Sequence, residues 1–81
     1  MNGFGKVYID VLHDPRISLN AKAIYSILAT YADNHGVCWP SMDKLMENTN
    51  VSYRTIYRAL NELINYKYVK RTGKKYKLYK K

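Results

Sequence analysis

The sequence predicts a single α+β domain made of three helices, a short N-terminal strand and a C-terminal β-hairpin. Apolar residues recur at helical spacing in three segments, and each segment follows a serine that can cap a helix. Two regions nearer the ends of the chain instead alternate polar and apolar residues, as strands do. A chain of 81 residues has the size of one domain, so we expect residues 1–81 to fold as one unit.

The N-terminal part of the chain is expected to form a strand and then a helix. The alternating residues 5–11 predict the strand, which Asp14-Pro15 would end. Ser18 can then cap a helix over residues 19–33, and the helix would end at residues 34–36. The apolar side of this helix is Ala21, Ile24, Ile27, Leu28 and Tyr31.

Two further helices follow with a tight turn between them. The first is expected over residues 41–48, with Ser41 as its cap. Asn50 can adopt the left-handed conformation that the turn requires. Ser52 can cap the second helix, over residues 53–66. The residues expected to face inward are Met42, Leu45 and Met46 in the first helix and Ile56, Leu60, Leu63 and Ile64 in the second.

The remaining segments are expected to be extended. Strands over residues 68–71 and 75–79 would form a hairpin around Thr72-Gly73-Lys74. Residues 37–39 are also expected to be extended, with Trp39 as a hydrophobic lid beside Pro40.

Charge is concentrated in the C-terminal part of the chain. Residues 51–81 hold ten of the fourteen Lys and Arg residues and a single acid, so they carry +9, while the first fifty residues carry −1. Like charges gathered in one segment repel one another, which favours a polyanionic partner. A basic helix followed by a basic hairpin can grip double-stranded DNA, which we expect to be this partner.

The helices over residues 41–48 and 53–66 have the length and patterning of a helix-turn-helix. In such a unit the second helix enters the major groove, where Arg can bridge guanine O6 and N7 and hydroxyl groups can donate to phosphates. The predicted DNA-binding residues are Ser41, Ser52, Tyr53, Arg54, Thr55, Tyr57, Arg58, Asn61, Arg71, Lys74, Lys75 and Lys77.

Three stretches carry a resemblance to a known family. They are I-S-L-N-A-K-A-I-Y at 17–25, C-W-P-S at 38–41 and V-S-Y-R-T-I-Y-R-A-L-N-E-L at 51–63. They resemble the N-terminal winged helix-turn-helix domains of plasmid and phage replication proteins, over residues 17–71. The resemblance implies that the third helix lies in the major groove and that the hairpin, or wing, touches adjacent backbone or minor groove. It carries a DNA-binding role over to Ser52, Arg54, Thr55 and Arg58 on the helix and to Arg71, Lys74 and Lys75 on the wing.

Other classes of function lack their usual residues in this sequence. His13, His35 and Cys38 fall short of the roughly four ligands that structural zinc needs. Paired carboxylates, a glycine-rich phosphate loop and an H-E-x-x-H motif are missing too. We therefore expect neither an enzyme nor a bound metal or cofactor. The most apolar stretch, 21–32, is too short and too polar to span a bilayer, so we expect a cytoplasmic protein without a membrane partner.

The leading interpretation is a small phage or plasmid protein that binds DNA as a transcriptional regulator or as a replication-origin-binding factor. Two alternatives remain open at this point. The domain could dock an acidic protein partner, or the basic, tyrosine-rich hairpin could bind RNA. We expect a monomer or a weak homodimer that pairs on DNA.

Overall fold

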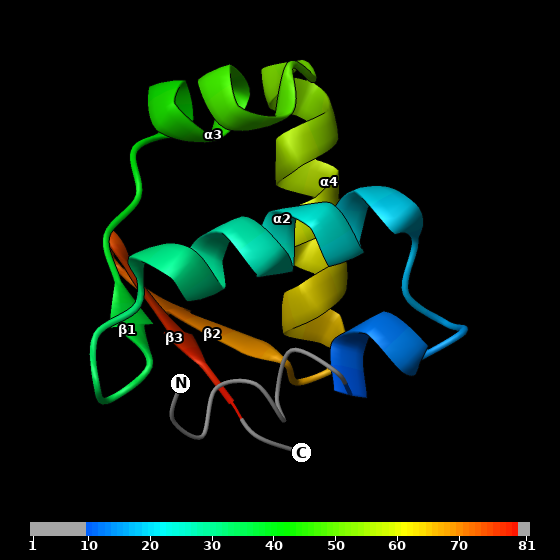
Figure 1. Ribbon diagram of the computed structural model, residues 1–81, viewed down its shortest axis with the longest axis horizontal. Coiled ribbons are helices and arrows are strands. Elements are labelled where there is room, and N and C mark those ends of the chain that lie inside the picture. The colour runs from blue at the N-terminus through cyan, green and yellow to red at the C-terminus, as the bar shows by residue number, and fades with distance from the viewer. Residues whose placement is uncertain (1–9, 80–81) are drawn as a thin grey trace.

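The structure is a computed structural model that describes residues 10–79. Residues 10–13 are helical, and the helices α2 (Leu19–Tyr31), α3 (Met42–Thr49) and α4 (Tyr53–Asn65) follow. The strands are β1 (Val37–Cys38), β2 (Val69–Thr72) and β3 (Lys75–Leu78). In Figure 1, α2 passes in front of α4, with α3 above it and the sheet below. The predicted α+β fold, with a helix-turn-helix and a C-terminal hairpin, is confirmed.

The three predicted serine caps are confirmed. Ser18, Ser41 and Ser52 each have extended backbone, and each side-chain oxygen accepts a hydrogen bond from the N–H three residues later, at 3.1–3.3 Å. This bond satisfies a backbone donor that the helix cannot satisfy itself, and so it sets where each helix begins. Asn50 lies in the left-handed region at φ 57° and ψ 28°, which ends α3 as predicted.

The hairpin belongs to a three-stranded antiparallel sheet in the order β1-β3-β2. Cys38 of β1 lies opposite Tyr76 of β3, and Tyr76 lies opposite Arg71 of β2. Tyr76 and Leu78 are buried, whereas the lysines that alternate with them along β3 are exposed. One face of the sheet therefore covers the core and the other faces solvent. Residues 37–39 were expected only to be extended, and the structure adds that two of them pair with the hairpin.

The core lies between α2, α4 and the inner face of the sheet. α2 packs mainly against α4, and α4 also packs against β2 (Figure 1). Tyr25 of α2 and Tyr68, which precedes β2, meet edge to face with ring centroids 6.2 Å apart. The buried apolar residues are Val11, Ile17, Ala21, Ile24, Tyr25, Leu28, Cys38, Leu45, Ile56, Ala59, Leu60, Leu63, Tyr68, Val69, Tyr76 and Leu78.

The strand expected over residues 5–11 is wrong where the structure describes it, because Asp10 and Val11 are helical. Residues 5–9 lie outside the described part of the chain. The Val11 carbonyl accepts a hydrogen bond from the Asp14 N–H at 3.2 Å, and the Val11 side chain is completely buried. A helical turn thus brings Val11 to the core, which an alternating pattern of a few residues does not reveal.

Six side chains expected to be buried are more exposed, and one of them is Ile64 of α4, which is half-buried. Ile27 is half-buried and Tyr31 exposed, because the inward face of α2 is centred on Ala21 and includes Tyr25 instead. Met46 is exposed and Met42 half-buried, since the short helix α3 buries only Leu45. Trp39 is 63% exposed and is not a lid. It follows the buried Cys38, and neighbouring residues of an extended chain point to opposite faces.

Candidate nucleic-acid interface

Helices α3 and α4 form the helix-turn-helix unit. The turn between them runs from the left-handed Asn50 through half-buried Val51 to Ser52, the cap of α4. Because Val51 packs against the core, the turn is held in place. In Figure 1 the axis of α3 lies across the N-terminal end of α4, so the first turn of α4 is at the end of the molecule next to α3.

The outer face of α4 is polar and basic, as the sequence analysis predicted. Arg54, Arg58, Asn61 and Asn65 are exposed, whereas Ile56, Leu60 and Leu63 are buried on the opposite side. Within residues 10–79, neither Arg54 nor Arg58 has a hydrogen bond or an ion pair. Both guanidinium groups are therefore open to a partner in solution.

The first turn of α4 presents hydroxyl groups and aromatic rings. The Ser52 and Thr55 hydroxyls lie 3.1 Å apart and hydrogen bond to each other, so both take part in the cap. Tyr53 is exposed and packs edge to face on half-buried Tyr57, at 5.1 Å between ring centroids. Ser41 lies at the start of α3, where its hydroxyl is exposed and caps that helix.

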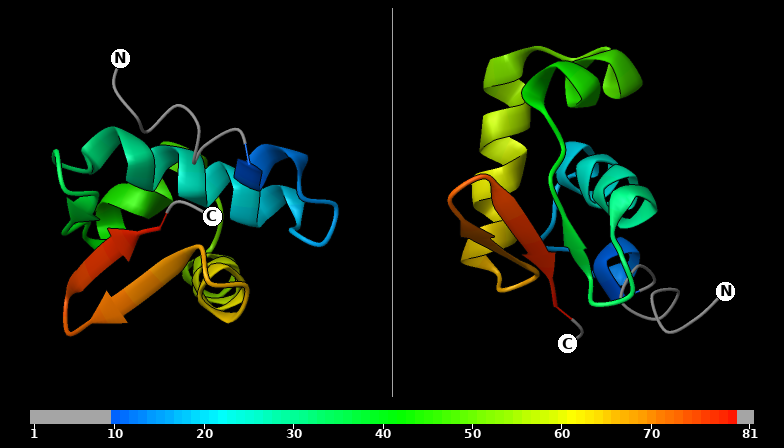
Figure 2. Two further views of the ribbon diagram at one scale, coloured as in Figure 1. Left: turned by 90° about the horizontal axis from the view of Figure 1, so that it is seen from below. Right: turned by 90° about the vertical axis from the view of Figure 1, so that its left-hand side faces the viewer.

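The hairpin of β2 and β3, the wing, carries the remaining predicted residues. Its turn contains Gly73 at φ 61°, and the Arg71 Nε–H donates to the Gly73 carbonyl at 3.2 Å. Lys74 is exposed in the turn. Lys75 and Lys77 are exposed on the face of the sheet opposite buried Tyr76 and Leu78. Wing and α4 lie next to each other in both views of Figure 2, so the structure brings the two basic groups onto one side of the molecule.

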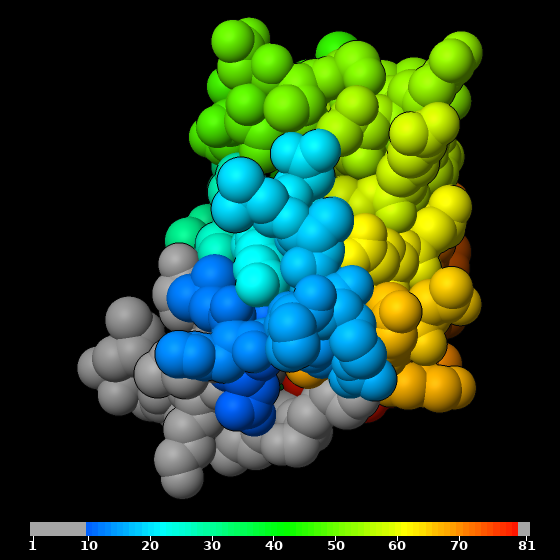
Figure 3. Space-filling view, turned by 90° about the vertical axis from the view of Figure 1, so that its right-hand side faces the viewer, coloured from blue at the N-terminus to red at the C-terminus, as the bar shows by residue number. Residues whose placement is uncertain are grey.

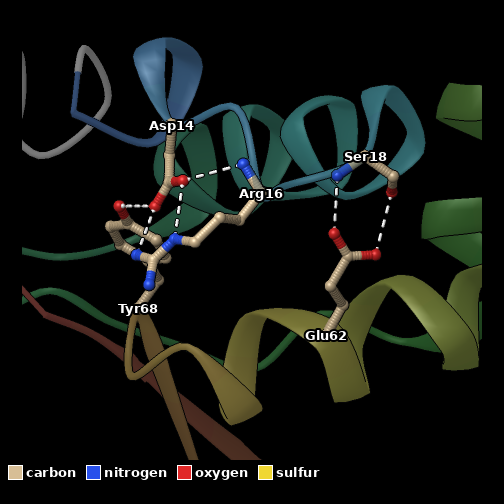
Figure 4. A network of polar contacts seen from close by, with 5 residues as sticks. All are labelled: Asp14, Arg16, Ser18, Glu62 and Tyr68. Carbon is tan, nitrogen blue, oxygen red and sulfur yellow. Dashed lines mark hydrogen bonds and ion pairs between the residues drawn. The ribbon is translucent and has the colours of Figure 1, made fainter.

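Two polar contacts that residue spacing did not predict tie α4 and the segment that follows it to the start of α2 (Figure 4). The Glu62 carboxylate accepts hydrogen bonds from the Ser18 N–H and, at 2.9 Å, from the Ser18 hydroxyl. Glu62 thus joins α4 to the N-terminal cap of α2. The sequence contains one indication that Glu62 has a particular role, because it is the only acid among residues 51–81.

The second contact centres on Asp14, which is 8% exposed. It accepts hydrogen bonds from Arg16 Nε at 3.0 Å, from Arg16 Nη2 at 2.7 Å and from the Tyr68 hydroxyl at 2.6 Å. Bonds from Arg16, and then from Tyr68, hold the pKa of Asp14 well below its usual range. The segment before α2 is therefore tied to the segment between α4 and β2, and the wing keeps a defined position beside α4.

Other kinds of site find little support in the described part of the chain. Among residues 10–79, no group of three or more His, Cys, Asp or Glu side chains could hold a metal ion. Burial raises the pKa of the Cys38 thiol to about 11, so this cysteine is not poised as a nucleophile. No helix within residues 10–79 is long and apolar enough to cross a membrane.

Comparison with known proteins agrees with this geometry. A family model described as a helix-turn-helix domain matches residues 16–69, two thirds of the chain. The match begins at the loop before α2, contains α3 and α4, and ends at the first residue of β2. No curated protein and no solved structure shows a significant match.

Proposed function

Because the chain belongs to a family of helix-turn-helix domains, a DNA-binding class, we propose that it binds double-stranded DNA in a sequence-specific manner. In this proposal α4 lies in the major groove and the wing lies on the adjacent backbone. The distribution of charge is the observation that carries the proposal. The outer face of α4 and the exposed face of the wing are basic, and the one acid on α4, Glu62, is turned toward Ser18.

The proposed roles follow from chemistry and position. Arg54 and Arg58 read base edges, since they share the outer face of α4 and have no competing partner in residues 10–79. Hydroxyl groups near the helix N-termini and the cations of the wing bind phosphates. These phosphate-binding residues are Ser41, Ser52, Tyr53, Thr55, Tyr57, Arg71, Lys74, Lys75 and Lys77, with Asn61 at the edge of the read-out face.

A biological role follows from the resemblance to replication proteins of plasmids and phages. We propose a small mobile-element protein that acts as a transcriptional regulator or binds a replication origin. The protein is a monomer or weak dimer in this proposal, and copies pair on DNA. A footprint on the DNA that flanks its own gene tests the role, because a regulator or origin-binding factor protects a defined site there.

The binding mode is tested by separating base reading from phosphate contact. If about five phosphates are neutralised, the logarithm of affinity falls with the logarithm of salt concentration at a slope of about −4.5. Losing an arginine that pairs with guanine costs about 1–3 kcal/mol on the selected site and little on scrambled duplex. Losing a wing lysine weakens binding to the selected and the scrambled duplex alike, and it lowers the steepness of the salt dependence by about one unit.

The variants are Arg54→Ala and Arg58→Ala compared with Lys74→Ala and Lys75→Ala, each measured by fluorescence anisotropy on selected and scrambled duplex with competitor RNA present. Leu60→Ala is the fold control, because deleting a buried leucine costs about 2–5 kcal/mol. If the arginine variants lose the same affinity for both duplexes, α4 does not recognise the base sequence. Preference for the RNA, or absence of duplex binding at low salt, would remove the proposed function.

A further inference from the structure

A groove lies beside the outer face of α4, on the side away from the wing. One wall is the loop before α2, and the other is the second half of α4 with Tyr66. Figure 3 looks onto this side, where the blue loop lies against the yellow helix. The residues that line the groove are Pro15, Arg16, Ile17, Ser18, Arg58, Asn61, Glu62, Asn65 and Tyr66.

The acid that lines this groove, Glu62, and the nearby Asp14 already have partners, whereas the two arginines of the groove are exposed to solvent. Both oxygens of Glu62 accept hydrogen bonds from Ser18, and Asp14 is buried beneath Arg16. Arg16 remains 55% exposed, and Arg58 is exposed. Two guanidinium groups and the amides of Asn61 and Asn65 are thus among the polar donors that the groove presents to a ligand.

Arg16 is held rigidly while its outer end stays accessible. Its Nε and Nη2 donate to Asp14 at 3.0 and 2.7 Å (Figure 4). Its guanidinium carbon lies 4.6 Å from the centroid of the Tyr66 ring. A guanidinium has five N–H donors, more than Asp14 uses. Because the side chain is already ordered, binding an anion costs it little further conformational entropy.

The groove adjoins the surface that would face DNA. Arg58, Asn61 and Asn65 lie both on the outer face of α4 and in the groove. A helix inserted in the major groove has a phosphate backbone along each side, and here the wing occupies one side and Arg16 the other. We propose that Arg16 binds a backbone phosphate of the duplex whose major groove α4 enters, with Asn61 and Asn65 as neighbouring donors. This inference rests on the proposed function.

The test compares two variants that break the same ion pair from opposite sides. Arg16→Gln removes the cation, whereas Asp14→Asn removes its partner and leaves the cation in place. Each is titrated with a mixed-sequence DNA duplex from about 50 to about 200 mM salt, where one lost phosphate contact changes the salt slope by about 0.9. Thermal melts followed by circular dichroism give the temperature at which each variant begins to unfold, and binding is measured below that temperature.

We expect Arg16→Gln to lower the steepness of the salt dependence by about 0.9 and the affinity about three- to tenfold. Asp14→Asn keeps the wild-type slope. Arg16→Lys, which retains the charge, keeps the slope even where Arg16→Gln is too unstable to assay. Three results would overturn the inference: a wild-type salt slope in Arg16→Gln, a reduced salt slope in Arg16→Lys, or an equally reduced salt slope in Asp14→Asn. In each case Arg16 would act only on the fold. If the wild-type protein does not bind duplex DNA, the proposed function itself is wrong.

Discussion

Removing the hydroxyl group of Tyr68 is expected to destabilise the domain, whereas the same change at the neighbouring Tyr25 is not. Both rings are buried and touch edge to face. The Tyr68 hydroxyl donates to the Asp14 carboxylate at 2.6 Å. The Tyr25 hydroxyl is buried without a hydrogen-bond partner among residues 10–79. Tyr68→Phe therefore removes a buried hydroxyl group that has a hydrogen-bond partner, whereas Tyr25→Phe removes one that has none among residues 10–79.

The magnitude follows from the kind of bond that is lost. A hydrogen bond to a charged group contributes about 1.5–3 kcal/mol, and the lower part of that range applies here because Arg16 still binds Asp14. A loss of about 1.5–2 kcal/mol lowers Tm by roughly 6–15 °C in a domain of this size. Tyr25→Phe removes a buried hydroxyl that has no partner, so we expect between no change and a gain of about 1 kcal/mol.

The assay is urea unfolding at neutral pH, followed by circular dichroism and by tyrosine fluorescence to check that the two transitions coincide. Equal m-values for the two variants would show that the denatured states are comparable. If Tyr25→Phe destabilises the domain as much as Tyr68→Phe, ring packing and not the bond to Asp14 holds this region, and the reasoning fails.

Three further outcomes are expected. The lowered pKa of Asp14 means that its ionised form stabilises the fold above the unfolded-state pKa of 3.8, and that this stabilisation is lost as pH falls toward the folded-state value. Acid titration of stability should therefore show a smaller drop below about pH 4 for Asp14→Asn than for the wild type. Lys67 has φ 68°, so Lys67→Gly should raise the free energy of unfolding by about 0.5–1 kcal/mol, and an unchanged or lower Tm would contradict this. Cys38 is 1% exposed with a pKa of about 11, so alkylation at pH 8 should be slow in the folded protein and rapid in urea, whereas equal rates would show that the site opens readily.

The local features of this protein follow from residue type and spacing along the chain. Each of Ser18, Ser41 and Ser52 caps a helix through a bond to the residue three positions later, and Asn50 forms the turn by its own backbone conformation. Such features depend on neighbours in the chain, so residue type and spacing are enough to predict them. The basic outer face of α4 follows in the same way from helical periodicity.

Which residues far apart in the chain meet depends instead on how the helices pack. Glu62 reaches Ser18 across 44 positions and Tyr68 reaches Asp14 across 54, and both contacts depend on how α2 crosses α4. Periodicity does not encode that crossing, because more than one set of residues on α2 could face inward, and the structure buries Tyr25 where Tyr31 was expected. For the same reason Arg16, which belongs to the part of the chain without excess positive charge, lines the same groove as Arg58 only after the chain has folded.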